Sequence, residues 1–222
     1  MGIAENIQRL RATLPGHVTL VAVSKNRPVS DILEAFQAGQ RDFGENKVQE
    51  LLVKHPQLPS DIRWHLIGHL QTNKVRSMLP LVHLVHSVDS YRLLKEINRE
   101  SAKMNRVTAC LLQFYIASEE SKFGFSLDEA VQMLEDSEYR SLRNVSVRGV
   151  MGMATFTDNQ ETVRQEFREL LRIFTFLKEE YFVSSSEFRE VSMGMSGDYR
   201  LAVEEGSTMV RIGTSIFGER TK

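Results

Sequence analysis

The sequence predicts an α/β fold, and within that class a single-domain (β/α)8 barrel, the TIM-barrel architecture. Apolar runs of strand length alternate with amphipathic stretches, and eight such runs occur along the chain. The runs are apolar on both faces, as expected of parallel strands covered by helices. The chain has 222 residues, fewer than the ~250 of a typical barrel. We therefore expect one domain over residues 1–222, and the alternative is a doubly wound open sheet.

Each predicted strand is a short apolar run bounded by polar or turn-forming residues. Strands that alternate with helices are expected to lie parallel to one another in one sheet. The predicted strands are residues 17–25, 41–45, 62–68, 81–89, 107–116, 147–155, 188–194 and 208–214.

Helical spacing and end signals mark the predicted helices. Pro28 and Gly39 suit the start and the stop of the first. Asp89 or Ser90 is the expected cap of another, and Ser126 with Glu129 forms a capping-box pair. The predicted helices are residues 27–40, 46–55, 72–79, 90–105, 126–136, 163–181 and 199–206.

Composition excludes several classes of protein. The chain is 41% hydrophobic and 26% charged, so it can bury a core. Its net charge is −1 with no long basic run, which argues against nucleic-acid binding. The N-terminal residues resemble neither a signal peptide nor a membrane span, and no later run reaches about 18 apolar residues. The one cysteine, Cys110, lies in an apolar run, so we expect a buried thiol, a cytoplasmic location and no membrane partner.

Lys25 ends the first predicted strand, "LVAVSK". Reactive groups of this fold lie at the C-terminal ends of the strands. Alternation places Val21, Val23 and Lys25 on one face, so an inward face would bring the amine into the barrel mouth. A lysine in partly apolar surroundings is neutral more often, and a neutral amine attacks aldehydes. The alternative is a lysine just past the strand that reaches solvent.

The loops after strands seven and eight suit a phosphate group. Barrels of this class often bind phosphate there, and glycines and hydroxyls allow close approach and donation. A lysine nucleophile beside a phosphate site suggests a phosphorylated aldehyde, and pyridoxal 5′-phosphate (PLP) is the candidate cofactor. The residues that these loops offer are Ser192, Gly194, Ser196, Gly197, Gly213, Thr214 and Ser215.

Arg211 is the third element of the predicted site, because its side chain shares a strand face with Gly213. A guanidinium inside a barrel needs a partner. One interpretation is a buried ion pair with a glutamate such as Glu45. The other is contact with the pyridine nitrogen of PLP. Arginine does not give up a proton, so the nitrogen would stay unprotonated and the ring would be a poor electron sink.

Six stretches identify a family. They are "VAVSK", "FGENKVQE", "WHLIGHLQTNK", "HSVDS", "SMGMSGD" and "GSTMVRIGTSIFGER". Together they resemble the YggS/PROSC family of pyridoxal-phosphate homeostasis proteins over nearly the whole chain. The resemblance implies a single-domain barrel like the N-terminal domain of alanine racemase, with PLP bound as a Schiff base.

The resemblance also assigns residues to the cofactor. It implies a Schiff base on Lys25, phosphate contacts from Ser196 and from the loop of Gly213 and Thr214, and Arg211 at the ring nitrogen. Asn46, in "FGEN", looks like a further residue on the cofactor side.

The remaining candidates come from the residues themselves. His65 could line the pocket near the ring, because Trp64 faces the other way. Met195 is expected to pack in the pocket. A metal site formed by His65, His69, His83 and His86 is disfavoured, because their spacing is not that of a helical zinc pair.

Some residues are expected to be structural or depart from the family pattern. Glu45 and Glu50 could form an acid/base pair, but a place at a solvated helix start is favoured. Tyr115 and the loop 154–159 depart from the family pattern, and both are expected at the barrel mouth.

Two function classes remain. The first is a non-enzymatic PLP binder that buffers or delivers the cofactor, with apo PLP-dependent enzymes as recipients. The second is a PLP-dependent amino-acid racemase, which needs a base on each face of the substrate carbon. In alanine racemases the opposing base is a tyrosine, and a C-terminal β domain completes the site. This chain stops at Lys222, just after strand eight, so the binder, as a monomer, is favoured.

Overall fold

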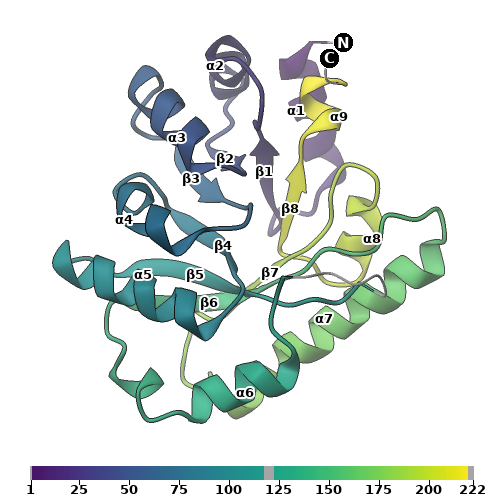
Figure 1. Ribbon diagram of the computed structural model, residues 1–222. Helices are drawn as coiled ribbons and strands as arrows, with labels where there is room; N and C mark the ends of the chain where they lie inside the picture. Colours follow the sequence, from purple (N-terminus) through teal and green to yellow (C-terminus); the bar gives the residue numbers. More distant parts are fainter. Residues whose placement is uncertain (1, 118–122, 220–222) are drawn as a thin grey trace.

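Eight parallel strands form a closed barrel in a computed structural model that describes residues 2–117 and 123–219 (Figure 1). Each strand pairs with the next along the chain, and β1 pairs with β8 to close the ring. This confirms the (β/α)8 barrel and excludes the open sheet. The strands are β1 Thr19–Val23, β2 Asp42–Glu45, β3 Arg63–Leu66, β4 Leu84–Val88, β5 Thr108–Gln113, β6 Val145–Met151, β7 Glu190–Ser192 and β8 Met209–Ile212.

Helices surround the barrel (Figure 1). Every predicted helix is present, although several are shorter than their predicted segments. The α-helices are α1 Ile3–Thr13, α2 Val29–Gln37, α3 Val48–Lys54, α4 Val75–Met78, α5 Tyr91–Lys103, α6 Leu127–Glu135, α7 Gln160–Glu180, α8 Tyr199–Glu204 and α9 Thr214–Phe217. The short 3-10 helices are η1 His55–Gln57, η2 Thr72–Lys74 and η3 Tyr139–Ser141.

Side-chain caps explain where three helices begin. Ser90, rather than Asp89, caps α5 by accepting the N–H of Leu93. Both halves of the predicted capping box of α6 are present, between Ser126 and Glu129. Helix α7 begins before the predicted position because Asn159 accepts two N–H groups of its first turn.

Helix α1 lies beside α9, so the two ends of the described chain meet (Figure 1). The side-chain amide of Asn6 donates to the carbonyl of Ile216 at 2.9 Å. Ile7 and Leu10 anchor α1 in the core. This contact places α9, and with it the loop after β8, against the first helix.

The apolar core has two parts. The larger part lies between the strands and the helices, and it includes Cys110. Burial raises the pKa of this thiol to about 12, which makes it unreactive at neutral pH. The smaller part fills the barrel interior with Val21, Leu84, Ala109, Leu111, Met151 and Met209. No helix within the described ranges is long and apolar enough to cross a membrane.

Candidate functional site

A cavity of about 410 Å³ opens at the C-terminal ends of β1 and β8. The loops after β6 and β7 form its other walls. Val21 lies inside the barrel, so the inward face of β1 is the face that carries Val23 and Lys25 into this cavity. Seven of the eight predicted site residues line the same cavity: Lys25, Asn46, Met195, Ser196, Arg211, Gly213 and Thr214.

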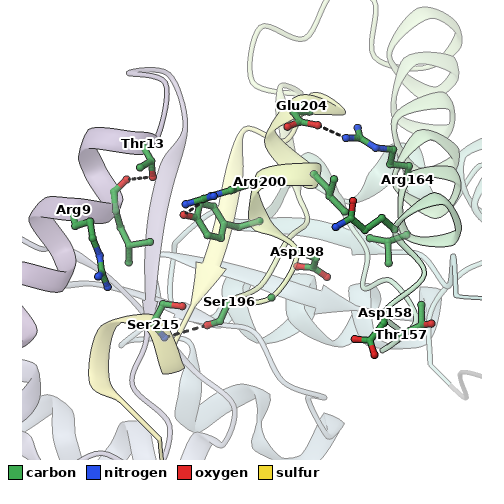
Figure 2. Close-up of a pocket in the computed structure, with 16 residues that line it drawn as sticks. Arg9, Thr13, Thr157, Asp158, Arg164, Ser196, Asp198, Arg200, Glu204 and Ser215 are labelled. Atoms are coloured by element: carbon green, nitrogen blue, oxygen red, sulfur yellow. Dashed lines mark hydrogen bonds and ion pairs between the residues drawn. The ribbon is translucent and has the colours of Figure 1, made fainter. Parts of the chain in front are cut away.

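A second hollow, of about 720 Å³, shares the loop 196–198 with this cavity, and Figure 2 shows the residues that line it. It is lined largely by polar side chains from α1, α7 and α8. One of its arginines, Arg164, pairs with Glu204 and Glu205. The first cavity is the candidate site, because it combines an amine, a buried guanidinium and hydroxyls.

The residues on either side of Lys25 are held by an ion cluster of the buried Glu45 and Lys54 with the half-buried Glu50. The Ser24 hydroxyl donates to Glu45 at 2.6 Å, and Lys54 Nζ donates to the Ser24 carbonyl at 2.9 Å. The N–H of Asn26 donates to Glu50 at 2.7 Å. Lys54 joins the two carboxylates at 2.8 and 3.0 Å. The cluster therefore fixes the backbone that presents Lys25.

The expectation that Glu45 and Glu50 lie at a solvated helix start is wrong for Glu45, which is fully buried. Burial raises the pKa of Glu45, although hydrogen bonds from Lys54 and Ser24 act in the opposite direction. Glu50 and Lys54 have the i, i+4 spacing of a helical ion pair. That spacing was the signal in the sequence that could have revealed the cluster.

Asn26 adopts a left-handed conformation, with φ of +58°. This region is unusual for a residue other than glycine, and asparagine tolerates it better than most. The turn after β1 is therefore a specific conformation, and the contact with Glu50 stabilises it.

Ser196 joins the two loops that were predicted to bind phosphate. Its hydroxyl oxygen accepts the N–H of Gly213 at 3.2 Å. It also accepts the N–H of Ser215 at 3.5 Å (Figure 2). A hydroxyl has two lone pairs and one proton. Because these two N–H groups occupy both lone pairs of Ser196, its hydroxyl can still donate one hydrogen bond to a ligand. Thr214, between these two residues, adds a second hydroxyl to the cavity wall.

Asp198 is a site residue that the sequence analysis missed. Its carboxylate accepts the N–H of Met195 and so shapes the turn that carries Ser196. Burial raises the pKa of Asp198, and the hydrogen bond from Met195 and the charge of Arg211 oppose that rise. An aspartate one residue before a helix is a common cap, which was the available signal.

Glycines allow the close backbone approaches at this end of the barrel. Gly194 has φ of +93°, and a Cβ there would lie 2.5 Å from the Cβ of Ala202. A Cβ on Gly68 would lie 2.4 Å from the carbonyl oxygen of Asn46. Gly68 therefore lets the backbone of Asn46 approach the end of β3 and reach the cavity wall.

Arg211 is 4% exposed and is held by groups of the barrel wall. Its Nη1 donates to the carbonyl and the hydroxyl of Ser192 at 2.8 and 2.5 Å, and its Nη2 donates to the carbonyl of Gly152 at 2.9 Å. Burial lowers the pKa of Arg211 to about 10, and Asp198 opposes this change. The guanidinium therefore stays charged at neutral pH. The alternative of an ion pair with Glu45 is not observed, because Glu45 bonds Lys54 and Ser24.

His65 is not among the described residues that line the cavity. It is 1% exposed and lies deeper in the barrel, where it contacts His86 and Asp42. Ile67, two residues further along the same face of the chain, lines the cavity instead. The alternation of the strand correctly predicts that His65 faces the barrel interior. It does not predict how deep in the barrel His65 lies.

The loop 153–158 lines the cavity, as expected of a loop at the mouth, whereas Tyr115 is half exposed and is not among the described residues of the wall. Glu166 of α7 ties this loop down by accepting the N–H and the hydroxyl of Thr155 at 2.7 and 2.8 Å. Phe156 is fully exposed at the rim.

Three of the four histidines considered for a metal site, His65, His69 and His86, form hydrogen bonds with other side chains. His69 contacts Asp89 at 2.9 Å on the surface, and His65 contacts His86 in the interior. Within the described residues, no group of three or more histidine, cysteine or acidic side chains is arranged to hold a metal ion.

The fold and the site define a barrel of the alanine racemase N-terminal class. A family model described as "Alanine racemase, N-terminal domain" matches residues 2–221. A curated relative named "Pyridoxal phosphate homeostasis protein" from Aquifex aeolicus is 40% identical over 202 residues, which cover 90% of this chain and 86% of the relative. A protein of the same name from Homo sapiens is 37% identical over 212 residues, covering 90% and 76%. This chain belongs to the family of pyridoxal phosphate homeostasis proteins.

Solved structures agree with this assignment. PipY from Synechococcus elongatus, solved without PLP, matches with a TM-score of 0.91 and 37% identity over 97% of this chain and all of that chain. The same protein solved with PLP bound matches with a TM-score of 0.85 and 36% identity over the same shares. An alanine racemase from Clostridium difficile has a TM-score of 0.80 at 12% identity, covering all of this chain and 57% of that one. At this identity the likeness concerns the fold alone.

Proposed function

We propose that this protein binds PLP, holds it as a Schiff base on Lys25 and takes part in PLP homeostasis by buffering or delivering the cofactor. One observation carries the proposal: Lys25, the buried Arg211 and the loops of Ser196 and Thr214 border one cavity. The relative solved with PLP bound supports the choice of ligand. We propose the whole chain, residues 1–222, as one PLP-binding unit that acts as a cytoplasmic monomer without nucleic-acid or membrane partners.

The side chains of the cavity fit PLP. When bound, PLP would supply an electrophilic aldehyde and an aromatic ring whose nitrogen can accept a hydrogen bond. Lys25 is the amine of the wall that could bind the aldehyde. The Ser196 and Thr214 hydroxyls could donate to the phosphate. Asn46 and Met195 border the same space.

Arg211 argues against substantial turnover of amino acids. Both Nη1 hydrogens bond Ser192, so Nε and the second hydrogen of Nη2 remain for a ligand. A charged guanidinium can only donate, which would keep a facing ring nitrogen unprotonated. Such a ring withdraws electrons poorly, so the site is suited to holding the cofactor.

The alternative function is a PLP-dependent amino-acid racemase. It would need a second base opposite Lys25. Among the described residues that line the cavity there is no tyrosine and no histidine. We therefore favour the carrier, with apo PLP-dependent enzymes as the recipients.

Mapping of the bound cofactor tests the proposal. The protein is mixed with PLP, reduced with borohydride and digested, and the modified lysine is identified by mass spectrometry. The expected result is modification of Lys25, and loss of the adduct in Lys25→Ala. Lys47 and Lys74 line a different hollow and serve as internal controls. Modification of either one with Lys25 unmodified would contradict the assignment.

A further inference from the structure

Five buried side chains form a continuous hydrogen-bonded chain through the barrel interior. Asp42 Oδ1 lies 3.1 Å from His65 Nε2, and His65 Nδ1 lies 2.8 Å from His86 Nε2. His86 Nδ1 lies 3.0 Å from the Ser192 hydroxyl, which accepts from Arg211 Nη1 at 2.5 Å. The chain therefore crosses from the first residue of β2 to the wall of the cavity. Its members come from β2, β3, β4, β7 and β8, and all five are buried.

The two ends of this chain have fixed chemistry. Arg211 can only donate hydrogen bonds, and an ionised Asp42 can only accept them. Burial by itself would raise the pKa of Asp42, but hydrogen bonds from Arg63 and His65 outweigh it and hold that pKa well below its usual range. Asp42 is therefore ionised at neutral pH. Arg63, which donates to it from Nε at 2.7 Å, balances its charge at the barrel floor.

When both imidazole rings are neutral, the fixed ends determine the direction of every hydrogen bond between them. A neutral imidazole has one N–H and one lone pair. Burial lowers the pKa of His86 well below its ordinary value, and the charge of Arg211 adds to this effect. With neutral rings, Ser192 donates to His86 Nδ1, His86 Nε2 donates to His65 Nδ1, and His65 Nε2 donates to Asp42. If every hydrogen bond ran in the opposite direction with both rings neutral, the lone pair of His65 Nε2 would face the carboxylate of Asp42. Two acceptors would then repel each other at that contact.

We propose that Asp42, His65, His86 and Ser192 are positioning residues that hold the Arg211 guanidinium in one orientation through this one-way series of hydrogen bonds. They line the interior below the cavity. A guanidinium that is already fixed loses less freedom when a ligand arrives. The effect on PLP rests on the proposed function, whereas the proton positions do not.

Histidine nitrogen NMR on the ligand-free protein tests the proton positions directly. The expected spectrum has both His65 and His86 as neutral rings with the proton on Nε2. In Asp42→Asn the preference for this tautomer should fall at His86 as well as at His65. His86 bonds His65 and Ser192 rather than Asp42, so this change shows transmission along the chain. A proton on Nδ1 of His86, a charged His65 at pH 7, or no change at His86 in Asp42→Asn would overturn the proposal.

A matched pair of serine variants tests the consequence for the ligand. Ser192→Ala removes one hydroxyl of the chain. Ser207→Ala removes an equally buried hydroxyl that lies within hydrogen-bond distance of the carbonyl oxygens of Val191, Met193 and Met209 and accepts the N–H of Met209. Ser192→Ala should weaken PLP and unphosphorylated pyridoxal by the same factor, about tenfold, because Arg211 faces the ring and not the phosphate. Ser207→Ala should leave both affinities unchanged at equal fold content.

The two experiments separate the two proposals. Equal affinities in Ser192→Ala and Ser207→Ala would overturn the positioning role while the PLP site stands. If the wild-type protein binds neither PLP nor pyridoxal, the proposed function fails, and the histidine spectra alone decide the proton order of the chain.

Discussion

The hydroxyls of Ser196 and Thr214 have different structural roles, which gives a prediction at the scale of single residues. Ser196 also bridges the two loops, whereas Thr214 is exposed to the cavity. Thr214→Val keeps the shape of the side chain but removes its donor. A lost hydrogen bond to a charged group typically costs about 1.5–3 kcal/mol. We expect Thr214→Val to weaken PLP roughly tenfold or more and to leave pyridoxal unchanged in equilibrium titrations.

Ser196→Ala is the companion variant. It should weaken PLP strongly and pyridoxal slightly, because the loops lose their bridge. If Thr214→Val weakened both ligands equally, the loops would not be binding the phosphate.

The buried cluster beneath Lys25 predicts a large effect on stability. Lys54→Met leaves Glu45 buried without its cation. Breaking a buried ion pair by removing one partner typically costs about 3–5 kcal/mol. Urea unfolding should show this loss, and the double variant Glu45→Gln with Lys54→Met should recover part of it. Lys47→Met, at an exposed position before the same helix, is the control and should have little effect.

The lowered pKa of Asp42 predicts that the free energy of unfolding depends on pH. Its pKa is lowered in the folded protein, and the unfolded value is about 3.9. A lowered pKa contributes stability above the unfolded value, and that contribution is lost as the pH falls towards the folded value. The unfolding free energy of Asp42→Asn should therefore fall below that of the wild type by about 2 kcal/mol at pH 7. The difference should shrink below about pH 4, and a difference that stays constant down to pH 2 would contradict this account.

At the scale of elements, the pairing of β6 with β7 depends on Gly149. A Cβ at this position would lie 1.8 Å from the carbonyl oxygen of Glu190, and its φ of +148° disfavours other residues. Gly149→Ala should therefore separate the two strands. The melting temperature should fall by well over the roughly 2–4 °C that a loss of about 1 kcal/mol produces in a chain of this length. Gly16→Ala is the control, because nothing lies within 4 Å of its added methyl group. Similar melting temperatures for the two variants would show that the barrel closes without this glycine.

Periodicity and end signals predicted the order and type of the main elements, because each depends on residues close in the sequence. Predicted strand 17–25 was too long at both ends, since β1 covers only Thr19–Val23, and the Ser24 carbonyl accepts the N–H of Arg27 in a turn that contains Lys25. Helix α1 was missed although Ile3, Ile7 and Leu10 have helical spacing. The ends of β1 are set by its pairing with neighbouring strands, which the local sequence does not show. The pattern of α1 is local and could have been recognised.

The placement of residues around the cavity was predictable where a single loop or strand end carries them. Lys25, Ser196 and Gly213 needed only the rule that parallel strands end at one mouth. The chain from Asp42 to Arg211 could not be predicted, because it depends on the register of strands far apart in the sequence, such as Gly44 beside His65. The same register explains why His65 lies below the cavity.

At the scale of the whole molecule, the described residues of the barrel present one amine, from Lys25, and two guanidinium groups, from Arg27 and Arg211, to a cavity that is open at its mouth. The loop 153–158, with the fully exposed Phe156, forms part of the rim. An open rim allows a ligand to enter and leave without rearrangement of the barrel. This arrangement suits a protein that exchanges PLP with others.

The cavity therefore predicts a protein that holds PLP without turning over amino acids. Arg211 stays charged, since its pKa is about 10, and no tyrosine or histidine occurs among the described residues of the wall. Incubation with L-alanine in deuterium oxide should give no D-alanine and at most slow exchange of the α-proton. The PLP-loaded protein should activate an apo PLP-dependent enzyme, whereas Lys25→Ala loaded in the same way should deliver less. Racemisation at about 1 per second or more, an ordinary enzyme rate, would favour the racemase instead.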